Sequence, residues 1–483
     1  MDGVFTAQQI REAEGRLMAQ LPDGTLMRRA AFGLARHARR MLGRTAGRRV
    51  GLLVGAGDNG GDALWAGVEL RRRGAGVAAV LLDPARAHPA GLAAFRRAGG
   101  RTHGPDADGL AALTGADLVL DGIVGISGRG GLRDPAPSLV AAVERAGVPI
   151  LAVDLPSGVD TDTGAVEGAA VTATATVAFG ARKPVHVLAA PRCGPVHVVD
   201  IGLGPYLPAP HADVLTAADV AARWPRPGPT DDKYSQGVTG VAAGSDAYPG
   251  APILATGAAV LATSGMVRFA GSAAQAVLAH WPEVVTAPTL AAAGRTQAWA
   301  VGPGIGTDDA GREVLAAAIA KDVPLVIDAD GITLLAHHDE LRSALAGRPV
   351  VLTPHAGEFA RIAGEVGADR IAATRRAAAE LGVTVLLKGN ATVVADPDGR
   401  ALVHPSTGSW AATAGSGDVL TGIIGALLAA GLPPWWAAGC AAFVHARAAD
   451  LAADGVPTPA SRLQAHIPAA LRSLLRPGAG AGG

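Results

Sequence analysis

Short apolar segments recur along this chain, and most are separated by Ala- and Arg-rich stretches with a helical pattern. The first half contains "RRVGLLVG", "GVAAVLLD", "ADLVLDGIVG", "VPILAVDLPSG", "ATVAFG" and "PVHVVDIG". Apolar strands that alternate with helices form parallel sheets whose two faces are both covered by helices. The pattern therefore predicts an α/β fold, preceded by a helical segment that extends to about residue 45.

The alternation lapses between about residues 205 and 230, where the sequence is rich in proline. A second α/β series then begins, with "GVTGVAAGS", "AWAVGPGIG", "VPLVIDAD", "PVVLTPHAGE", "VTVLLKG" and "ATVVADP". A stretch of this composition commonly separates two domains. We predict a Rossmann-like parallel-sheet domain at residues 1–212, a second α/β domain at 213–475 and a flexible tail at 476–483.

Charge and cysteine content narrow the classes of function. The 483 residues have a formal net charge of zero, which disfavours a general surface for nucleic acid or anionic membranes. Two cysteines, Cys193 and Cys440, are too few for a disulfide framework or a four-ligand zinc site. The N-terminal "MDGVFTAQQIREAE" lacks the apolar region of a signal peptide, and the apolar stretches are too short to span a membrane. We expect a soluble cytoplasmic protein that binds neither nucleic acid nor membranes.

Lysine is rare in this chain, because arginine supplies most of the 42 basic residues. Against that bias a lysine indicates a position that requires an ammonium group, since the two side chains are not equivalent. Lys183, Lys233 and Lys388 lie in Gly- or Pro-containing stretches typical of site loops, whereas Lys321 has the setting of an ordinary surface residue.

The segment "GAGDNGGD" contains a G-x-G-x-x-G match between a predicted strand and a predicted helix. Asp83 ends the next strand, about where a ribose-binding acid is expected in a dinucleotide fold. However, Asp58 and Asp62 lie in the turn and first helical turn, where their charge would repel a pyrophosphate. The charge of these two residues therefore disfavours a dehydrogenase.

Polar residues also follow other predicted strands of the first half: Asn59, Asp121, Asp154 and Ser157. In an open parallel sheet, ligands bind beyond the carboxyl ends of the strands. Carboxylate, amide, hydroxyl and carbonyl oxygens together suit an alkali or alkaline-earth cation. The alternative is that Asn59 and Asp121 only cap turns and helices.

Four motifs, "GAGDNGGDALWAG", "DGIVGISGRG", "AVDLPSGVDTDTG" and "FGARKP", resemble the epimerase half of the NAD(P)H-hydrate repair enzymes. The resemblance covers nearly all of residues 1–210 and implies a potassium ion held by Asn59, Asp121 and Ser157. It differs at Asp58 and Ala63, where the family commonly has Asn and Gly. The implied contacts to the hydrated cofactor are Asp58, Asn59, Gly60, Gly61, Asp62, Gly125, Ile126, Ser127, Gly128, Arg129, Gly130, Gly131 and Asp154.

The chemistry of the hydrate explains why an acid is required. The hydrate carries a hydroxyl on the carbon beside the ring nitrogen, and its departure as water leaves an iminium-like cation. Water can return on either face, which interconverts the two epimers. A carboxylate can supply and recover the proton and can stabilise the cation. We assign this role to Asp154.

The second half carries the glycine-containing segments "GPGIG", "LTPHAGE", "LLKGNAT" and "TAGSGD". Glycine-rich backbone at a helix N-terminus forms an anion hole, to which Lys388 adds a point charge for a phosphate. Asp418 follows the glycines and is placed to take a proton from a substrate hydroxyl. Helix capping by Asp418 is the alternative, but it does not explain the small residues before it. For His355, a turn residue and a catalytic residue are both open.

No Walker motif is present in this half. Instead "KYSQG", "GPGIG", "LTPHAGE", "LLKGNATVVADP" and "GSWAATAGSGDVLTGII" resemble the ADP-dependent hydrate dehydratases of the ribokinase-like superfamily, over about residues 230–455. The resemblance implies a ribokinase-like C-terminal domain with magnesium and with Asp418 as the base. The implied contacts to the hydrate are Ala251, Gly304, His355 and Asp418. The implied contacts to the nucleotide are Lys388, Gly389, Asn390, Ala391, Thr392 and Gly417.

Together the two resemblances imply a bifunctional metabolite-repair enzyme, expected to be a homo-oligomer. One domain interconverts (R)- and (S)-NADHX or NADPHX. The other transfers phosphate from ADP to the C6 hydroxyl of the S epimer and releases it, which yields NAD(P)H, AMP and phosphate. Two alternatives stay open: a small-molecule kinase of the vitamin-precursor type, and an N-terminal domain that only binds a ligand or serves as a scaffold.

Overall fold

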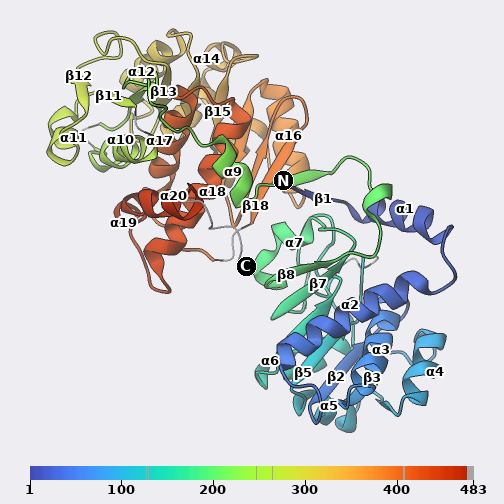
Figure 1. Cartoon of the computed structure of the whole chain (residues 1–483). Helices are drawn as coiled ribbons and strands as arrows, with labels where there is room; N and C mark the ends of the chain where they lie inside the picture. Colours follow the sequence, from blue (N-terminus) through green and yellow to red (C-terminus); the bar gives the residue numbers. More distant parts are fainter. Residues whose placement is uncertain (127, 129, 246, 264, 406–407, 476–483) are drawn as a thin grey trace. The chain divides into compact units, whose positions relative to one another are not determined.

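The computed structural model describes all residues except 127, 129, 246, 264, 406–407 and 476–483. The chain folds into two compact units (Figure 1). The N-terminal unit comprises Gly3–Ala212, and the C-terminal unit comprises Met1–Asp2 with the chain from Asp213 onward. Two short strands, β1 (Asp2–Val4) and β9 (Ala212–Val214), cross the boundaries between these units in the sequence. The predicted tail at 476–483 lies outside the described residues.

The N-terminal unit is built on a seven-stranded sheet in the order β4-β3-β2-β5-β6-β7-β8, with every neighbouring pair parallel. The strands are β2 (Arg49–Val54), β3 (Gly76–Leu81), β4 (Arg101–His103), β5 (Leu118–Gly122), β6 (Ile150–Val153), β7 (Ala175–Phe179) and β8 (Val196–Val199). The strand order reverses between β2 and β5, and ligands bind at such a switch point. The segments that follow β2 and β5 are therefore the first place to look for a site.

The helices of this unit are α1 (Ala7–Met18), α2 (Thr25–Leu42), α3 (Asp58–Arg71), α4 (Pro89–Arg97), α5 (Ala107–Thr114), α6 (Ala136–Arg145), α7 (Val185–Leu188) and α8 (Ala190–Cys193), with a 3₁₀ turn η1 (Gly204–Tyr206). The expected helical segment before the sheet is confirmed by α1 and α2, although the three-residue strand β1 precedes them. Helix α1 begins at a capping box, in which Thr6 and Gln9 satisfy each other's backbone amides. Leu52 and Leu120 are fully buried neighbours in β2 and β5, as helices on both faces of the sheet require.

In the C-terminal unit the strands run in the order β9-β18-β17-β16-β15-β14-β13-β10-β11-β12. All neighbours are parallel except β17, which is antiparallel to both β16 and β18. The strands are β10 (Val238–Ala242), β11 (Met266–Ala270), β12 (Val285–Ala287), β13 (Ala298–Val301), β14 (Leu325–Ile327), β15 (Val350–Leu352), β16 (Thr384–Leu387), β17 (Ala391–Ala395) and β18 (Ala401–Pro405). Here the strand order reverses between β10 and β13, beside the segment 302–306.

The helices of the C-terminal unit are α9 (Ala217–Arg223), α10 (Gly250–Ala262), α11 (Ala274–His280), α12 (Asp309–Ile319), α13 (Asp330–His337), α14 (Asp339–Ser343), α15 (Ala356–Ala363), α16 (Arg370–Leu381), α17 (Ser416–Ala429), α18 (Pro434–Ala453), α19 (Ala460–Ala465) and α20 (Ile467–Leu475). Within the described part of the chain, none of the helices combines the length and apolar character that a bilayer span requires.

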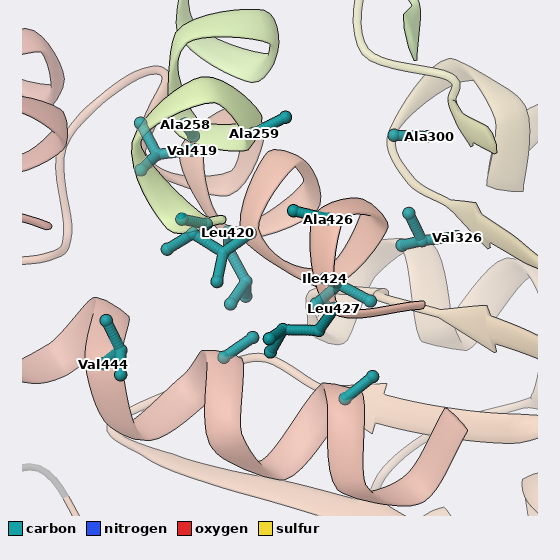
Figure 2. Close-up of a cluster of buried hydrophobic side chains, with 14 of the residues drawn as sticks. Ala258, Ala259, Ala300, Val326, Val419, Leu420, Ile424, Ala426, Leu427 and Val444 are labelled. Atoms are coloured by element: carbon teal, nitrogen blue, oxygen red, sulfur yellow. The ribbon is translucent and has the colours of Figure 1, made fainter. Parts of the chain in front are cut away.

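Helix α17 lies at the centre of the largest apolar core of the C-terminal unit (Figure 2). Beyond Asp418 it is apolar on almost all sides, which is typical of a fully buried helix. Figure 2 shows its side chains Leu420, Ile424 and Leu427 among residues of α10, α18 and the sheet. A Cβ atom at Gly422 would clash with the carbonyl oxygen of Ala255 in α10, so the helices touch backbone to backbone. This packing fixes the N-terminus of α17, where the predicted base lies.

Candidate functional site

The turn between β2 and α3 brings the backbone of two strand ends together. Gly57 precedes α3 with φ 90°, a conformation that favours glycine. A Cβ atom at Gly55 would clash with the carbonyl oxygen of Ile123, just after β5. The glycines of the G-x-G-x-x-G match therefore permit close backbone packing here. Asp62 is only 9% exposed in the first turns of α3, and a pyrophosphate at this helix terminus would face its carboxyl group.

Asp121 and Ser157 meet at the carboxyl ends of β5 and β6. The Ser157 Oγ donates to Asp121 Oδ1 at 2.7 Å, and the Ser157 amide donates to Asp121 Oδ2 at 2.8 Å. The Ser157 Oγ also lies 3.2 Å from the carbonyl oxygen of Val124. Burial raises the pKa of Asp121 to about 6, although hydrogen bonds from Ser157 and Ile123 oppose the shift.

The predicted cation ligands converge in this region. Asn59 Oδ1 lies about 3.1 Å from the position that a Cβ atom of Gly125 would take, beside Val124. Asp121 and Ser157 offer only oxygen atoms, Asn59 can add its amide oxygen, and the carbonyl of Val124 adds another. No cluster of three or more His, Cys, Asp or Glu side chains suited to a metal occurs among the described residues. This donor set fits a weakly held alkali cation such as potassium better than a transition metal.

Asp154 forms a buried ion pair with Lys183. Asp154 Oδ1 accepts from Lys183 Nζ at 2.7 Å and from the Phe179 amide at 3.0 Å. The side chains are 7% and 1% exposed. Asp154 has φ 68°, which is strained for a residue other than glycine and is frequent at functional sites. Lys183, one of the three lysines singled out in the sequence, is therefore the partner of the predicted catalytic acid.

His186 supports the backbone of Asp154. Its Nδ1 accepts from the Lys183 amide at 2.9 Å, so its Nε2 carries the proton and donates to the carbonyl oxygen of Asp154 at 2.8 Å. Burial and the Lys183 ammonium lower the pKa of His186 to about 3. The neutral imidazole thus holds the strained residue in place.

The charge of Asp154 acts on two further carboxyl groups, Glu14 on α1 and Asp62 on α3, and the charge of Asp58 on α3 acts on the same two. Burial raises the pKa of Asp62 well above its usual value, and the charges of Asp154, Asp58 and Glu14 raise it further. Burial, followed by the charge of Asp154, raises the pKa of Glu14 to about 7. The sequence interpretation missed Glu14, although its spacing of four residues from the buried Ile10 places it on the inner face of α1.

The predicted substrate loop at 125–131 packs against α1. Arg11 Nη2 donates to the carbonyl oxygen of Ile126 at 2.7 Å. Gly130 has φ 71°, and a Cβ atom at Gly131 would clash with the carbonyl oxygen of Glu167. Ser127 and Arg129, which the resemblance also implies as contacts, lie outside the described residues.

Asp418 is the third residue of α17 and does not cap it. The residue that precedes the helix is Gly415, with φ 84° and no side-chain cap. Burial and the charge of Asp328 raise the pKa of Asp418 to about 7, against the opposing charge of Lys388. The described part of the chain holds no hydrogen bond to its carboxylate. The helix-cap alternative is thus wrong, and the carboxyl group is free to contact a ligand.

Asp328 follows β14 and anchors a charged network beside Asp418. Lys388 Nζ lies 2.7 Å from Asp328 Oδ1, and Thr421 Oγ1 donates to Asp328 Oδ2 at 2.8 Å. Burial disfavours the charge of Asp328, yet the Lys388 ammonium and these hydrogen bonds hold its pKa below the usual value. Glu358 Oε2 lies 3.7 Å from the same ammonium. The sequence interpretation identified Lys388 and missed Asp328.

Two glycine segments keep backbone close to this network. A Cβ atom at Gly417 would lie 3.4 Å from both Asp328 Oδ2 and Lys388 Nζ, so the first turn of α17 lies directly beside the ion pair. Gly304 has φ 66°, and its Cβ position would be 3.3 Å from the Cβ of Ala251. The predicted hydrate contacts Gly304 and Ala251 are therefore neighbours. The adjacent Gly306 amide donates to Asp330, whose charge also raises the pKa of Asp418.

His355 caps α15. Its Nδ1 accepts from the Gly357 amide at 3.0 Å, and Glu358 Oε2 accepts from the His355 amide at 2.8 Å. The ring is 57% exposed. The structure thus gives His355 the turn role and orients Glu358 toward Lys388, while contact with a substrate stays a prediction.

The predicted nucleotide loop at 388–392 is shorter than expected. Only Lys388, Gly389 and Asn390 connect β16 to β17, because Ala391 and Thr392 already pair with β18. Ala391 is fully buried, so its side chain faces the core. The loop is short because the apolar run after "KGN" begins an antiparallel hairpin, whereas the sequence predicted only parallel strands separated by helices.

Comparison with known proteins follows the same division. Residues 239–469 match the family model described as NAD(P)H-hydrate dehydratase, and residues 23–185 match the YjeF-related protein N-terminus. The bifunctional NAD(P)H-hydrate repair enzyme Nnr of Mycobacterium tuberculosis is 59% identical over 97% of this chain and 99% of that protein. Its counterpart in Mycobacterium leprae is 57% identical over the same shares. A solved ribokinase-like superfamily protein from Enterococcus faecalis, 23% identical, aligns with a TM-score of 0.51 over 55% of this chain and 98% of that protein, a likeness of fold.

Proposed function

Because this chain belongs to the family of bifunctional NAD(P)H-hydrate repair enzymes, we propose that its two units carry two separate active sites for one damaged cofactor. The N-terminal unit interconverts (R)- and (S)-NAD(P)HX, and the C-terminal unit dehydrates the S epimer with ADP. The observation that carries the dehydratase assignment is Asp418, a carboxyl group without a protein partner among the described residues, beside the Asp328–Lys388 ion pair.

In the C-terminal site, Asp418 accepts the proton of the C6 hydroxyl as that oxygen attacks the terminal phosphoryl group of ADP. The amides at the start of α17 and the ammonium of Lys388 stabilise the charge on the transferring group. AMP leaves with the electrons of the broken phosphoanhydride bond. Phosphate then departs from C6, a proton leaves the neighbouring ring carbon, and the dihydropyridine is restored.

The residues present fit the two metal ions that the resemblance implies. Magnesium is commonly held by one or two carboxylates together with substrate phosphates. Asp330 and Glu358 offer such carboxylates near Asp418 and Lys388. When bound, the ion would neutralise phosphate charge. Asn59, Asp121 and Ser157 would hold potassium in the other unit, where it would add positive charge beside several carboxyl groups.

In the N-terminal site, the carboxylate of Asp154 stabilises the cation that forms when the hydroxyl departs. Lys183 and the Phe179 amide bind one of its oxygens, which fixes the direction of the other. His186 holds the strained backbone, so the negative charge is preorganised before the cation forms.

The pH dependence of dehydration tests the role of Asp418. The base must be ionised, and its pKa is raised to about 7, so the fraction in the active form falls as the pH drops. With ADP saturating, we expect kcat/KM for (S)-NADHX to be constant above about pH 8 and to fall roughly tenfold per unit below about pH 6. The measurement is the initial rate of NADH absorbance recovery.

Asp330→Asn is the matched variant for this profile. The charge of Asp330 raises the pKa of Asp418, so its removal should move the acid limb to lower pH, even if the loss of a magnesium carboxylate also lowers the maximal rate. A rate that is independent of pH from 5.5 to 8.5 in the parent protein would contradict Asp418 as the base.

A further inference from the structure

The hydrogen bonds of Asp154 leave the source of the proton unassigned. Its Oδ1 accepts from both Lys183 Nζ and the Phe179 amide. An oxygen that already accepts from an ammonium and an amide is placed to stabilise a cation rather than to hand over a proton. Loss of the hydroxyl as water nevertheless requires a proton on its oxygen. A second acid must therefore lie within the same site.

Asp62 indicates where that acid lies. It is 9% exposed, and its Oδ1 is buried without a hydrogen-bond partner. Buried polar atoms in folded proteins nearly always have partners, so an unpaired carboxyl oxygen points to a ligand or to a shared proton. The charged groups that face Asp62 are Asp154, Asp58 and Glu14. No basic side chain is among them.

Helix α1 supplies the opposite wall. Arg11 holds the carbonyl oxygen of Ile126 in the substrate loop, and Glu14 follows on the same helix face three residues later. Glu14 is partly buried, unlike the exposed Glu12 on the outer face. The charged groups that face Glu14 are Asp154, Lys183, Asp58 and Arg11. Glu14 thus lies within electrostatic range of Asp154 and Lys183, and part of its side chain remains exposed to a ligand.

We propose that Glu14 is the acid that donates and recovers the proton in epimerisation, in a site that it shares with the carboxyl groups of Asp62 and Asp154. This inference rests on the proposed epimerase function of the N-terminal unit. It divides between two residues the role that the sequence interpretation gave to Asp154 alone: Asp154 stabilises the cation, and Glu14 moves the proton.

The step balances without a further reactant. The Glu14 carboxyl proton passes to the C6 hydroxyl, the C6–O bond breaks, and water leaves. The lone pair of the ring nitrogen forms the C6–N double bond, whose positive charge faces the Asp154 carboxylate. Water then adds to the opposite face of C6, its proton returns to Glu14, and the other epimer is released.

Glu14→Gln in the full-length chain is the direct test. We expect the kcat of R-to-S conversion, measured by chromatographic separation of the epimers without ADP, to fall at least about 100-fold. The KM should change little, because Gln preserves the shape and polarity of the side chain. Dehydration of the S epimer with ADP should keep the parent rate. Glu12→Gln, the same change on the exposed face of α1, should leave both activities unaltered.

The pH profile separates proton transfer from a merely structural role. In the parent protein the epimerisation rate should fall at alkaline pH, as Glu14 loses its proton, and Glu14→Asp should retain this limb at a shifted position. Asp58→Asn should move the limb to lower pH, because the charge of Asp58 raises the pKa of Glu14.

Two outcomes overturn the proposal, and they differ. If the parent protein interconverts the epimers and Glu14→Gln does so within threefold of its rate, Glu14 is not the proton donor although the epimerase function stands. If the parent protein itself does not interconvert the epimers, the proposed function of the N-terminal unit fails and this inference fails with it.

Discussion

Asp418→Asn should abolish ADP-dependent dehydration while R-to-S interconversion of the hydrates continues at the parent rate. Loss of a general base costs about 10²–10⁴-fold in rate, and the neutral amide cannot accept the hydroxyl proton. Gly415, not Asp418, precedes α17, so the substitution removes no helix cap. The expected result is a kcat for dehydration reduced at least about 100-fold in a folded protein.

This experiment depends on comparing the dehydration rate with the epimerisation rate. Both rates are measured on the same preparation, one by NADH absorbance with ADP and the other by separation of epimers without ADP. Equal loss of both activities would contradict the model of two independent sites. Full retention of dehydration would exclude Asp418 as the base.

Lys183→Met should destabilise the N-terminal unit by about 3–5 kcal/mol, because it leaves Asp154 as an unpaired buried charge. The Lys183 side chain is 1% exposed, and its Nζ lies 2.7 Å from Asp154 Oδ1 and 3.3 Å from the carbonyl oxygen of Phe179. The measurement is the free energy of unfolding, monitored with a spectroscopic signal that reports on the N-terminal unit. Lys321→Met, at a lysine without such a partner in the described structure, should have little effect.

A double variant distinguishes loss of the pair from loss of packing. When Asp154 is also replaced by Leu, no charge is left buried, so Lys183→Met with Asp154→Leu should be more stable than Lys183→Met alone. Equal stability of Lys183→Met and the parent protein would contradict the structural account of this ion pair.

The strand ends were the most predictable part of the two sites. Each apolar strand followed by a polar residue indicates a position at the carboxyl edge of the sheet, and Asn59, Asp121 and Asp154 were found from this rule. Asp328 follows β14 in the same manner, in "VIDAD", and the same signal could have identified it. Its importance emerged only from its contact with Lys388, which is 60 residues away in sequence.

Residues on helices and in pairs were harder to predict. Glu14 lies on α1, far in sequence from the strand ends, and its only signal is the helical spacing from Ile10. The rarity of lysine singled out Lys183 and Lys388, but no sequence pattern states that they pair with Asp154 and Asp328. Such pairings depend on the register of distant segments, which periodicity does not reveal.

The two sites share one arrangement of charged residues and use it in different reactions. Each places a lysine against a buried acid at a strand end, and each leaves a second carboxyl group with a pKa raised to about 7 beside that pair. A carboxyl group with such a pKa can exchange a proton near neutral pH. In the N-terminal unit this group is Glu14, and in the C-terminal unit it is Asp418.

Recovery of intact NADH from a mixture of both hydrate epimers, with and without ADP, tests the central claim most directly. With ADP, the account predicts that absorbance returns until the whole mixture is converted and that AMP and phosphate are released in equal amounts. Without ADP, it predicts interconversion of the epimers but no recovery. Recovery that stops at the S fraction, or a product that retains the phosphate, would contradict the account.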